Sequence, residues 1–171
     1  LQHFLESARN TFDAFAQQVS AAELHAAAEL IWSAQAEGNR VHVTGIGKPG
    51  HVATYLASLM SSTGTPTYFL HGTEAVHGSC GQLVPGDVVI CIFNSGETAE
   101  MKATVQAIRR NGCKIIGVTG NRNSWLANFA DTHLFAGVPE EGGPLNRAPR
   151  NSILAEMLVL QALSVVLQER R

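Results

Sequence analysis

A polar loop at residues 94–100, with the sequence Asn-Ser-Gly-Glu-Thr-Ala-Glu, has the residue types that bind an anion. The apolar run before it predicts a strand, and the pattern after it predicts a helix. A phosphate is favoured at a helix start, because the first N–H groups lack partners and the helix dipole is positive there. Ser95 and Thr98 add hydroxyl donors, and we expect Glu100 to take part in chemistry and Glu97 to be a structural acid. The loop therefore favours chemistry on a phosphorylated small molecule.

A glycine-rich turn at residues 45–50, Gly-Ile-Gly-Lys-Pro-Gly, matches the G-x-G-x-x-G pattern between a predicted strand and a predicted helix. A dinucleotide site also requires an acid about 20 residues later, and the chain has none at that point. The residues after the lysine also exclude a P-loop. The turn is either structural, with Lys48 on the surface, or Gly45 and Gly47 admit a ligand whose oxygens Lys48 faces. We favour the second interpretation.

Two histidines flank a glutamate in residues 71–77, His-Gly-Thr-Glu-Ala-Val-His. One Glu-x-x-His pair is half of a di-iron ligand set, and a zinc site takes three or four convergent ligands, so we expect no metal. His71 and His77 are either ordinary hydrogen-bonded loop residues, or His77 is a general acid or base near neutral pH.

Two further polar segments give weaker indications. Residues 61–65 end a predicted helix, where the dipole disfavours an anion, so a ligand role would depend on their hydroxyl groups. The acids Glu140 and Glu141 lie in a loop with glycine and proline, and they are either solvated or directed at a ligand. No G-x-S-x-G nucleophile elbow occurs, which leaves serine hydrolysis unsupported.

Short apolar runs and helical patterns alternate along the chain, and they must position these segments. Two leading helices are expected in residues 1–38, the first with an apolar face at residues 1, 4, 5, 8, 12, 15 and 19. A capping box of Ser20 and Glu23 opens the second. Strands are predicted at residues 41–44, 66–70, 87–93, 113–118 and 132–138, with helices between them and a last helix at 152–168.

This alternation predicts an α/β fold with a doubly wound, five-stranded parallel sheet flanked by helices. We expect one domain over residues 1–171, with its αβ core at 39–171. Ligands of such sheets bind at the carboxyl ends of the strands. The polar segments should therefore meet at one edge of the sheet.

Composition limits the classes of function. The 171 residues are 45% hydrophobic and only 15% charged, and the last helix is apolar almost all round, which favours contacts between subunits. The net charge of -2 gives no support to nucleic-acid binding. No apolar stretch reaches the ~18 residues of a membrane span, and no signal-peptide pattern is present. Three cysteines without a C-x-x-C pair favour buried free thiols and a cytoplasmic location.

Together these segments resemble the sugar isomerase (SIS) domain family, most closely its D-arabinose 5-phosphate isomerases. The motifs that carry the resemblance are Gly-Ile-Gly-Lys (45–48), Ser-Thr-Gly-Thr-Pro (62–66), Phe-Leu-His (69–71), Glu-Ala-Val-His-Gly (74–78), residues 94–100, and Pro-Leu-Asn-Arg-Ala-Pro (144–149). The resemblance implies a cofactor-free interconversion of D-arabinose 5-phosphate and D-ribulose 5-phosphate through an enediol. It also implies a homotetramer and a role in KDO biosynthesis.

The resemblance implies roles for individual residues. It assigns the phosphate to Ser62, Thr63, Ser95 and Thr98. It makes His77 the base on the substrate carbon, places Lys48 near the developing oxyanion, and matches Glu100 and Glu141 to family acids. The remaining predicted substrate-binding residues are Gly45, Gly47, His71 and Asn94.

The sequence also departs from the family pattern. Pro49 replaces the usual serine after Gly-Lys, and Arg-Asn-Ser at 150–152 replaces a Thr-Ser-Ser run, which affects sugar recognition. Many relatives continue into paired CBS domains, so the sequence is either a single-domain member or a part of a longer protein. Alternative functions are isomerisation of another phosphosugar, such as a hexulose 6-phosphate, and phosphosugar sensing without turnover. The joint presence of Lys48, His77, Glu100 and Glu141 argues against a pure sensor.

Overall fold

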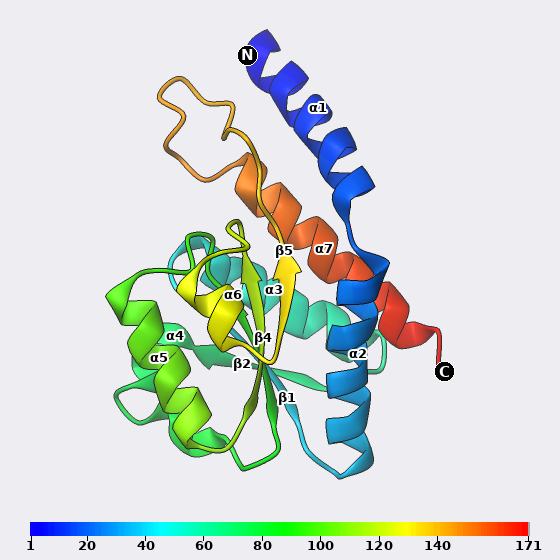
Figure 1. Cartoon of the computed structure of the whole chain (residues 1–171), viewed down its shortest axis with the longest axis vertical. Helices are drawn as coiled ribbons and strands as arrows, with labels where there is room; N and C mark the ends of the chain where they lie inside the picture. The colour runs from blue at the N-terminus through cyan, green and yellow to red at the C-terminus, as the bar shows by residue number, and fades with distance from the viewer. Residues whose placement is uncertain (171) are drawn as a thin grey trace.

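A computed structural model describes residues 1–170 (Figure 1). Its helices are α1 (Gln2–Gln18), α2 (Ala21–Ala36), α3 (Lys48–Ser62), α4 (Gly72–Ala75), the 3₁₀ helix η1 (Ser79–Gln82), α5 (Ala99–Arg110), α6 (Trp125–Phe129) and α7 (Asn151–Gln168). Its strands are β1 (Val41–Gly45), β2 (Thr67–His71), β3 (Val88–Ile92), β4 (Lys114–Thr119) and β5 (Thr132–Phe135).

The five strands form one parallel sheet in the order β2-β1-β3-β4-β5, which confirms the predicted fold class. The chain crosses from β1 to β2 in one direction and then continues from β3 on the other side of β1. The end of β1 pairs with the ends of both neighbours, since Gly45 is opposite His71 and Ile92. In a sheet of this order the crevice between β1 and β3 is the switch point at which ligands bind.

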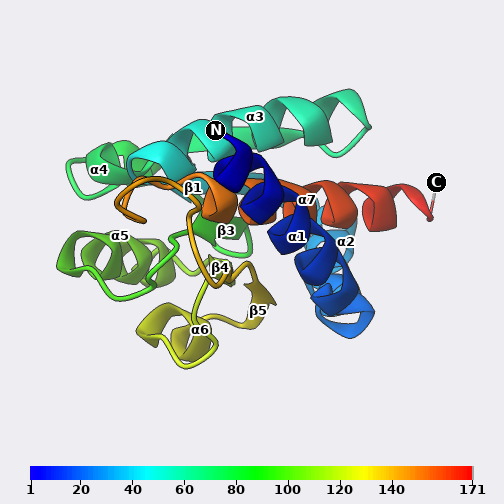
Figure 2. The ribbon, with the colours of Figure 1, turned by 90° about the horizontal axis from the view of Figure 1, so that it is seen from above.

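Helices cover both faces of the sheet (Figure 2). Side chains alternate along β3, so that Val88, Ile90 and Ile92 join the core under α2, α3 and α7, whereas Val89 and Cys91 join the core with α5 and α6. All five β3 residues are buried. A strand that is covered on both faces reads as a continuous apolar run, which is why the sequence revealed it.

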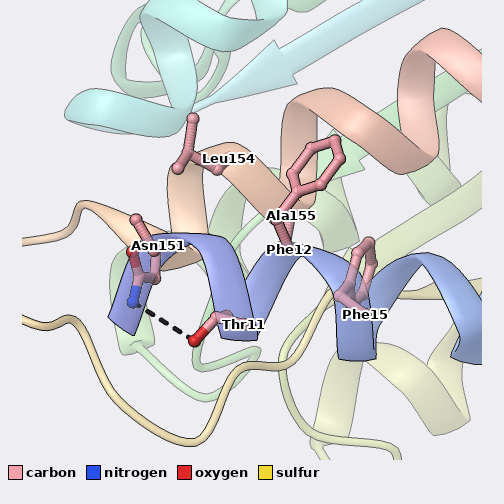
Figure 3. A pocket seen from close by; sticks show the side chains of 7 residues that line it. Thr11, Phe12, Phe15, Asn151, Leu154 and Ala155 are labelled. Carbon is pink, nitrogen blue, oxygen red and sulfur yellow. Dashed lines mark hydrogen bonds between the residues drawn. The ribbon is translucent and has the colours of Figure 1, made fainter. Parts of the chain in front are cut away.

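The predicted apolar face of α1 is only partly buried, since Phe15 is 3% exposed. The buried residues of α1 are Ser7, Thr11 and Phe15, while Leu5 and Phe12 are 52% and 44% exposed. Polar contacts explain this orientation, because the side chain of Asn151 donates to Ser7 Oγ at 3.1 Å and to Thr11 Oγ1 at 3.4 Å (Figure 3). The crevice between α1 and α7 has no room for a water molecule. The first helix therefore leaves Leu5 and Phe12 exposed and buries Phe15.

Helix α7 contradicts the prediction that no apolar stretch is long enough to span a membrane. Its 18 residues have a mean hydropathy of 1.4, so it is long and apolar enough to cross a membrane by length and composition alone. Half of the helix is buried, and it packs against α1, α2 and α3. Core helices of soluble proteins share these properties, and α7 is the core helix of this sheet face.

The start of α2 confirms one half of the predicted capping box. Ser20 Oγ accepts a hydrogen bond from the N–H of Glu23 at 3.2 Å. The Glu23 carboxylate does not return to Ser20; it accepts from the N–H of Phe135 at 3.3 Å and from the Arg122 guanidinium. The acid therefore joins α2 to the last strand. The three cysteines, Cys80, Cys91 and Cys113, are buried free thiols, as predicted.

Candidate active site

Two hollows open at the carboxyl edge of the sheet, one on each side of the switch point. The first has a volume of about 410 Å³ and lies among the loops that follow β3, β4 and β5. The second, of about 350 Å³, lies beside the turn after β1 and the end of β2. Asn94, Ser95 and Glu141 line the first hollow, and Gly45, Gly47 and His71 line the second. The structure therefore gathers half of the predicted site residues at these two hollows.

The loop between β3 and α5 is held in place by Glu97, which also lines the first hollow. Glu97 accepts from the N–H of Trp125 at 2.6 Å and from Lys102 Nζ at 2.9 Å, and these hydrogen bonds lower the pKa of Glu97. Gly96 has φ +66 and its carbonyl accepts from Leu126 N–H at 3.1 Å. Glu97 therefore joins the loop to α5 and α6, as expected of a structural acid, and it also lines the hollow.

Helix α5 begins at this loop with Thr98 as its N-cap. Thr98 Oγ1 accepts from Met101 N–H at 3.4 Å, and Ser95 Oγ accepts from Glu97 N–H at 3.4 Å. Both hydroxyl groups keep their hydrogens for another acceptor, since each of these contacts uses a lone pair. The start of a 12-residue helix with two hydroxyl donors can bind a phosphate.

The turn after β1 brings backbone close to backbone. A Cβ on Gly45 would lie 2.7 Å from the carbonyl carbon of Pro49, so only glycine fits there. Gly47 has φ +70, a conformation that glycine adopts without strain. Helix α3 starts directly afterwards, and Lys48 is exposed at its first position. Gly45 is required by the packing of the turn itself, so the close approach of a ligand to this turn stays a prediction.

The candidates in and near the segment after β2 differ in how they relate to the second hollow. Glu100 accepts a hydrogen bond from Thr73 Oγ1 at 3.2 Å, and Thr73 lines the second hollow. His71 caps α4, because its Nδ1 accepts from Glu74 N–H at 3.3 Å. His77 lies beyond α4, is exposed, and lines neither hollow. Within residues 1–170, its side chain has no hydrogen bond or ion pair.

Glu141 connects the first hollow with the start of α7. Its Oε2 accepts from the N–H groups of Arg150 at 2.6 Å and Ser152 at 3.1 Å. The N-cap residue Arg150 gives α7 no side-chain cap, so the carboxylate of Glu141 satisfies these free N–H groups. A negative charge at this position is also stabilised by the helix dipole. Both acids of this loop line the hollow: Glu141 is fixed by these N–H groups, and Glu140 by the Ser7 hydroxyl group, which donates to its Oε1 at 2.5 Å.

Ser62 and Thr63 do not lie with the other candidates. Helix α3 begins at the carboxyl edge and runs back over the sheet, so these residues at its end lie at the amino edge, roughly 20 Å away. Ser62 Oγ donates to the carbonyl of Leu59 at 2.8 Å, and Thr63 Oγ1 bonds to carbonyls of the same turn and to Ser164. The prediction that they share a phosphate site with Ser95 is wrong for a single chain.

A family model described as SIS domain matches residues 36–166. The chain belongs to the SIS-domain family. Arabinose 5-phosphate isomerase KdsD of Pseudomonas aeruginosa is 43% identical to it over 132 residues, which are 77% of this chain and 40% of that protein. The protein of the same name from Escherichia coli K12 is 42% identical over the same shares.

A solved structure supports the fold of the SIS domain directly. The structure of E. coli CFT073 c3406 in complex with arabinose 5-phosphate has a TM-score of 0.86 to this chain and 37% identity, and the match covers 99% of this chain and 88% of that one. The curated relatives are longer: the chain spans 40% of their length.

The SIS domain also contains site residues that the sequence did not single out. Gly120, Asn121 and Asn146 line the first hollow. Gly120 and Asn121 directly follow β4, and this position could have identified them from the sequence.

Glu156 was missed for another reason. It lies inside α7, is 1% exposed, and has no partner for either carboxyl oxygen. An acid in an apolar helix looks like an ordinary surface position until the packing is known.

Proposed function

We propose that this chain carries the active site of an arabinose 5-phosphate isomerase that needs no cofactor. One observation supports this most. The polar loop at residues 94–100, which can bind a phosphate, follows β3, and the glycine-rich turn with Lys48 follows the neighbouring strand β1, so both lie at the switch point of the sheet. The curated relatives are named for this activity, and the related solved structure is a complex with the corresponding sugar phosphate.

The proposed reaction moves a proton between C1 and C2 of the open-chain sugar through an enediol. Ser95, Thr98 and the start of α5 would hold the phosphate and so fix the chain of the sugar. Lys48 would stabilise the negative oxygen that forms, and His77 would take the proton from carbon. Glu100 and Glu141 would exchange protons with the sugar hydroxyl groups.

A homotetramer is part of this proposal. Leu5 and Phe12 on α1 and Val165 on α7 are 52%, 44% and 59% exposed, which is an apolar surface suited to burial between subunits. His77 lines neither hollow of its own chain, so an assembly is also a means of bringing it to a site. We place the protein in the cytoplasm and in KDO biosynthesis under the same proposal.

The test is conversion of D-arabinose 5-phosphate to D-ribulose 5-phosphate by the purified protein without added metal, followed by a ketose assay. We expect turnover, and Lys48→Met should abolish it. Tight binding of the sugar phosphate without any conversion would favour a sensor instead.

A second candidate substrate class has one observation in its favour. Arg150 precedes α7, beside the carboxylate of Glu141, where relatives have a Thr-Ser-Ser run. Arg150 lines neither hollow, but its N–H group donates to Glu141, so a change at this position alters the support of a carboxylate at the hollow and favours another phosphosugar such as a hexulose 6-phosphate. A panel of pentose and hexose phosphates decides between them by the ratio of their kcat/KM values.

We expect His77→Asn to lower kcat by about 100-fold or more while binding of the sugar phosphate changes little. The exposed side chain makes no contact whose loss would affect folding. Steady-state kinetics with calorimetric binding separates the two effects. Turnover close to that of the unmodified protein would remove His77 from the mechanism.

A further inference from the structure

The first turns of α7 contain a concentration of unsatisfied polar groups. Five buried side-chain atoms in the described part of the chain lack a hydrogen-bond partner, and four of them belong to Asn151, Ser152 and Glu156. These three side chains are 0%, 0% and 1% exposed. Buried polar groups are normally paired, so a cluster of this kind indicates a function rather than a packing requirement.

Glu156 is placed directly behind the site. Residues four apart share a face of a helix, so Glu156 lies one turn below Ser152, and the N–H of Ser152 donates to Glu141 Oε2 at 3.1 Å. Glu141 in turn lines the first hollow. Two carboxyl groups thus lie on either side of the start of α7, one facing the hollow and one inside the core.

The surroundings determine which of the two carries a proton. Burial, and then the negative charge of Glu141, raise the pKa of Glu156 to about 8. Helices α1, α2 and α3 pack against α7 and carry other titratable groups: His3, Glu6, Arg9 and Asp13; Glu23, His25 and Glu29; and Lys48, His51 and Tyr55. Apart from the half-buried Glu23, all of these groups are exposed, and Glu141 is the one whose charge acts on Glu156.

We propose that Glu156 is a positioning residue that stores a proton beneath Glu141, so that Glu141 is the one charged carboxyl group of the two. The start of α7 supplies two N–H groups and a dipole, which stabilise one carboxylate. With Glu156 neutral, that carboxylate is Glu141, free to accept a proton from a sugar hydroxyl. When Glu156 ionises, the second negative charge at the start of α7 repels an anionic substrate. The inference rests on the proposed function for its catalytic consequence but not for the coupling itself.

The coupling is tested by following glutamate side-chain carboxyl carbons by NMR across pH 4–10. One resonance should titrate near pH 8 and be missing in Glu156→Gln. In Glu141→Gln the same resonance should titrate at lower pH by at least half a unit, because a like charge has gone. An unchanged midpoint in Glu141→Gln would overturn the proposal, and this arm needs no turnover.

The kinetic consequence is tested with D-arabinose 5-phosphate. For the unmodified protein we expect KM to rise above pH 8, and for Glu156→Gln we expect this rise to move up by one pH unit or more, with kcat at pH 7 within about twofold. Glu169→Gln, the same change at the exposed far end of α7, should leave the profile in place. An identical alkaline limb in Glu156→Gln and the unmodified protein would contradict the proposal. Absence of turnover with the NMR coupling intact would count against the proposed function alone.

Discussion

Asp87 and Glu156 are both buried carboxyl groups, but they lie at opposite edges of the sheet and are supported in opposite ways. Asp87 precedes β3 at the amino edge, is 0% exposed, and accepts hydrogen bonds from Arg40 N–H at 2.9 Å, Val84 N–H at 3.0 Å and the His42 ring at 3.1 Å. Burial alone would raise the pKa of Asp87, but these hydrogen bonds lower it below its usual value. Glu156 has no partner, and its pKa rises.

The difference shows what each edge of the sheet does. At the amino edge one carboxylate joins the starts of β1 and β3, so its charge stabilises the fold. At the carboxyl edge a carboxyl group of the same chemistry is left unpaired, at a cost of about 1–3 kcal/mol for each unsatisfied group. Proteins keep such local violations mainly where function requires them. The unpaired group lies behind a residue that lines the hollow, which fits this rule.

The largest effect is expected for Asp87→Ala. The change leaves two peptide N–H groups and the His42 ring without an acceptor in the interior, so we expect a loss of about 4 kcal/mol in the free energy of unfolding. Urea denaturation at pH 7 measures it. The control Asp13→Ala, at an exposed position of α1, should change stability by no more than about 0.5 kcal/mol. A loss below about 1 kcal/mol for Asp87→Ala would show that the hydrogen bonds are dispensable.

The sequence predicted the architecture because its periodicities are local. Every strand and long helix was found from apolar runs and helical spacing, and Ser20 was recognised as a cap from its type and place. Ser62 and Thr63 were misplaced because the family likeness was given more weight than topology. They follow a helix, and in a right-handed βαβ unit a helix that begins at the carboxyl edge ends at the amino edge. The sequence therefore contained enough to exclude them.

Packing between elements accounts for what the sequence could not show. The apolar stripe of α1 predicted the helix correctly, but the buried face includes Ser7 and Thr11, so that Leu5 and Phe12 of the stripe are exposed. Glu156 is one acid in an apolar helix, and only the fold shows that its side chain points into the core. Periodicity identifies which residues share a face. It does not say what covers that face.

An effect of intermediate size, and of opposite sign, is expected for Glu156→Gln. The folded state holds a proton on Glu156 up to about pH 8, whereas the unfolded chain releases it near pH 4.5. Stability therefore falls as pH rises between these values, and at pH 7 this group costs about 3 kcal/mol. The variant should unfold at a higher temperature than the unmodified protein at pH 7–8, by roughly 5–10 °C. The two should converge near pH 4.5, and a difference that does not depend on pH would contradict this account.

The smallest effect is expected for Ser152→Ala. The change removes a buried hydroxyl group that has no partner and leaves the N–H that bonds Glu141 in place, so stability should rise by about 1 kcal/mol. Thr104→Val is the matched comparison, because Thr104 Oγ1 is equally buried but donates to the Gly72 carbonyl at 2.8 Å. Its loss should cost about 1–2 kcal/mol. Urea denaturation of both variants measures the contrast. If Ser152→Ala lowers stability as much as Thr104→Val, the hydroxyl group of Ser152 has a hydrogen-bond partner in solution. The polar groups at the start of α7 are then paired, as those of Asp87 are at the amino edge.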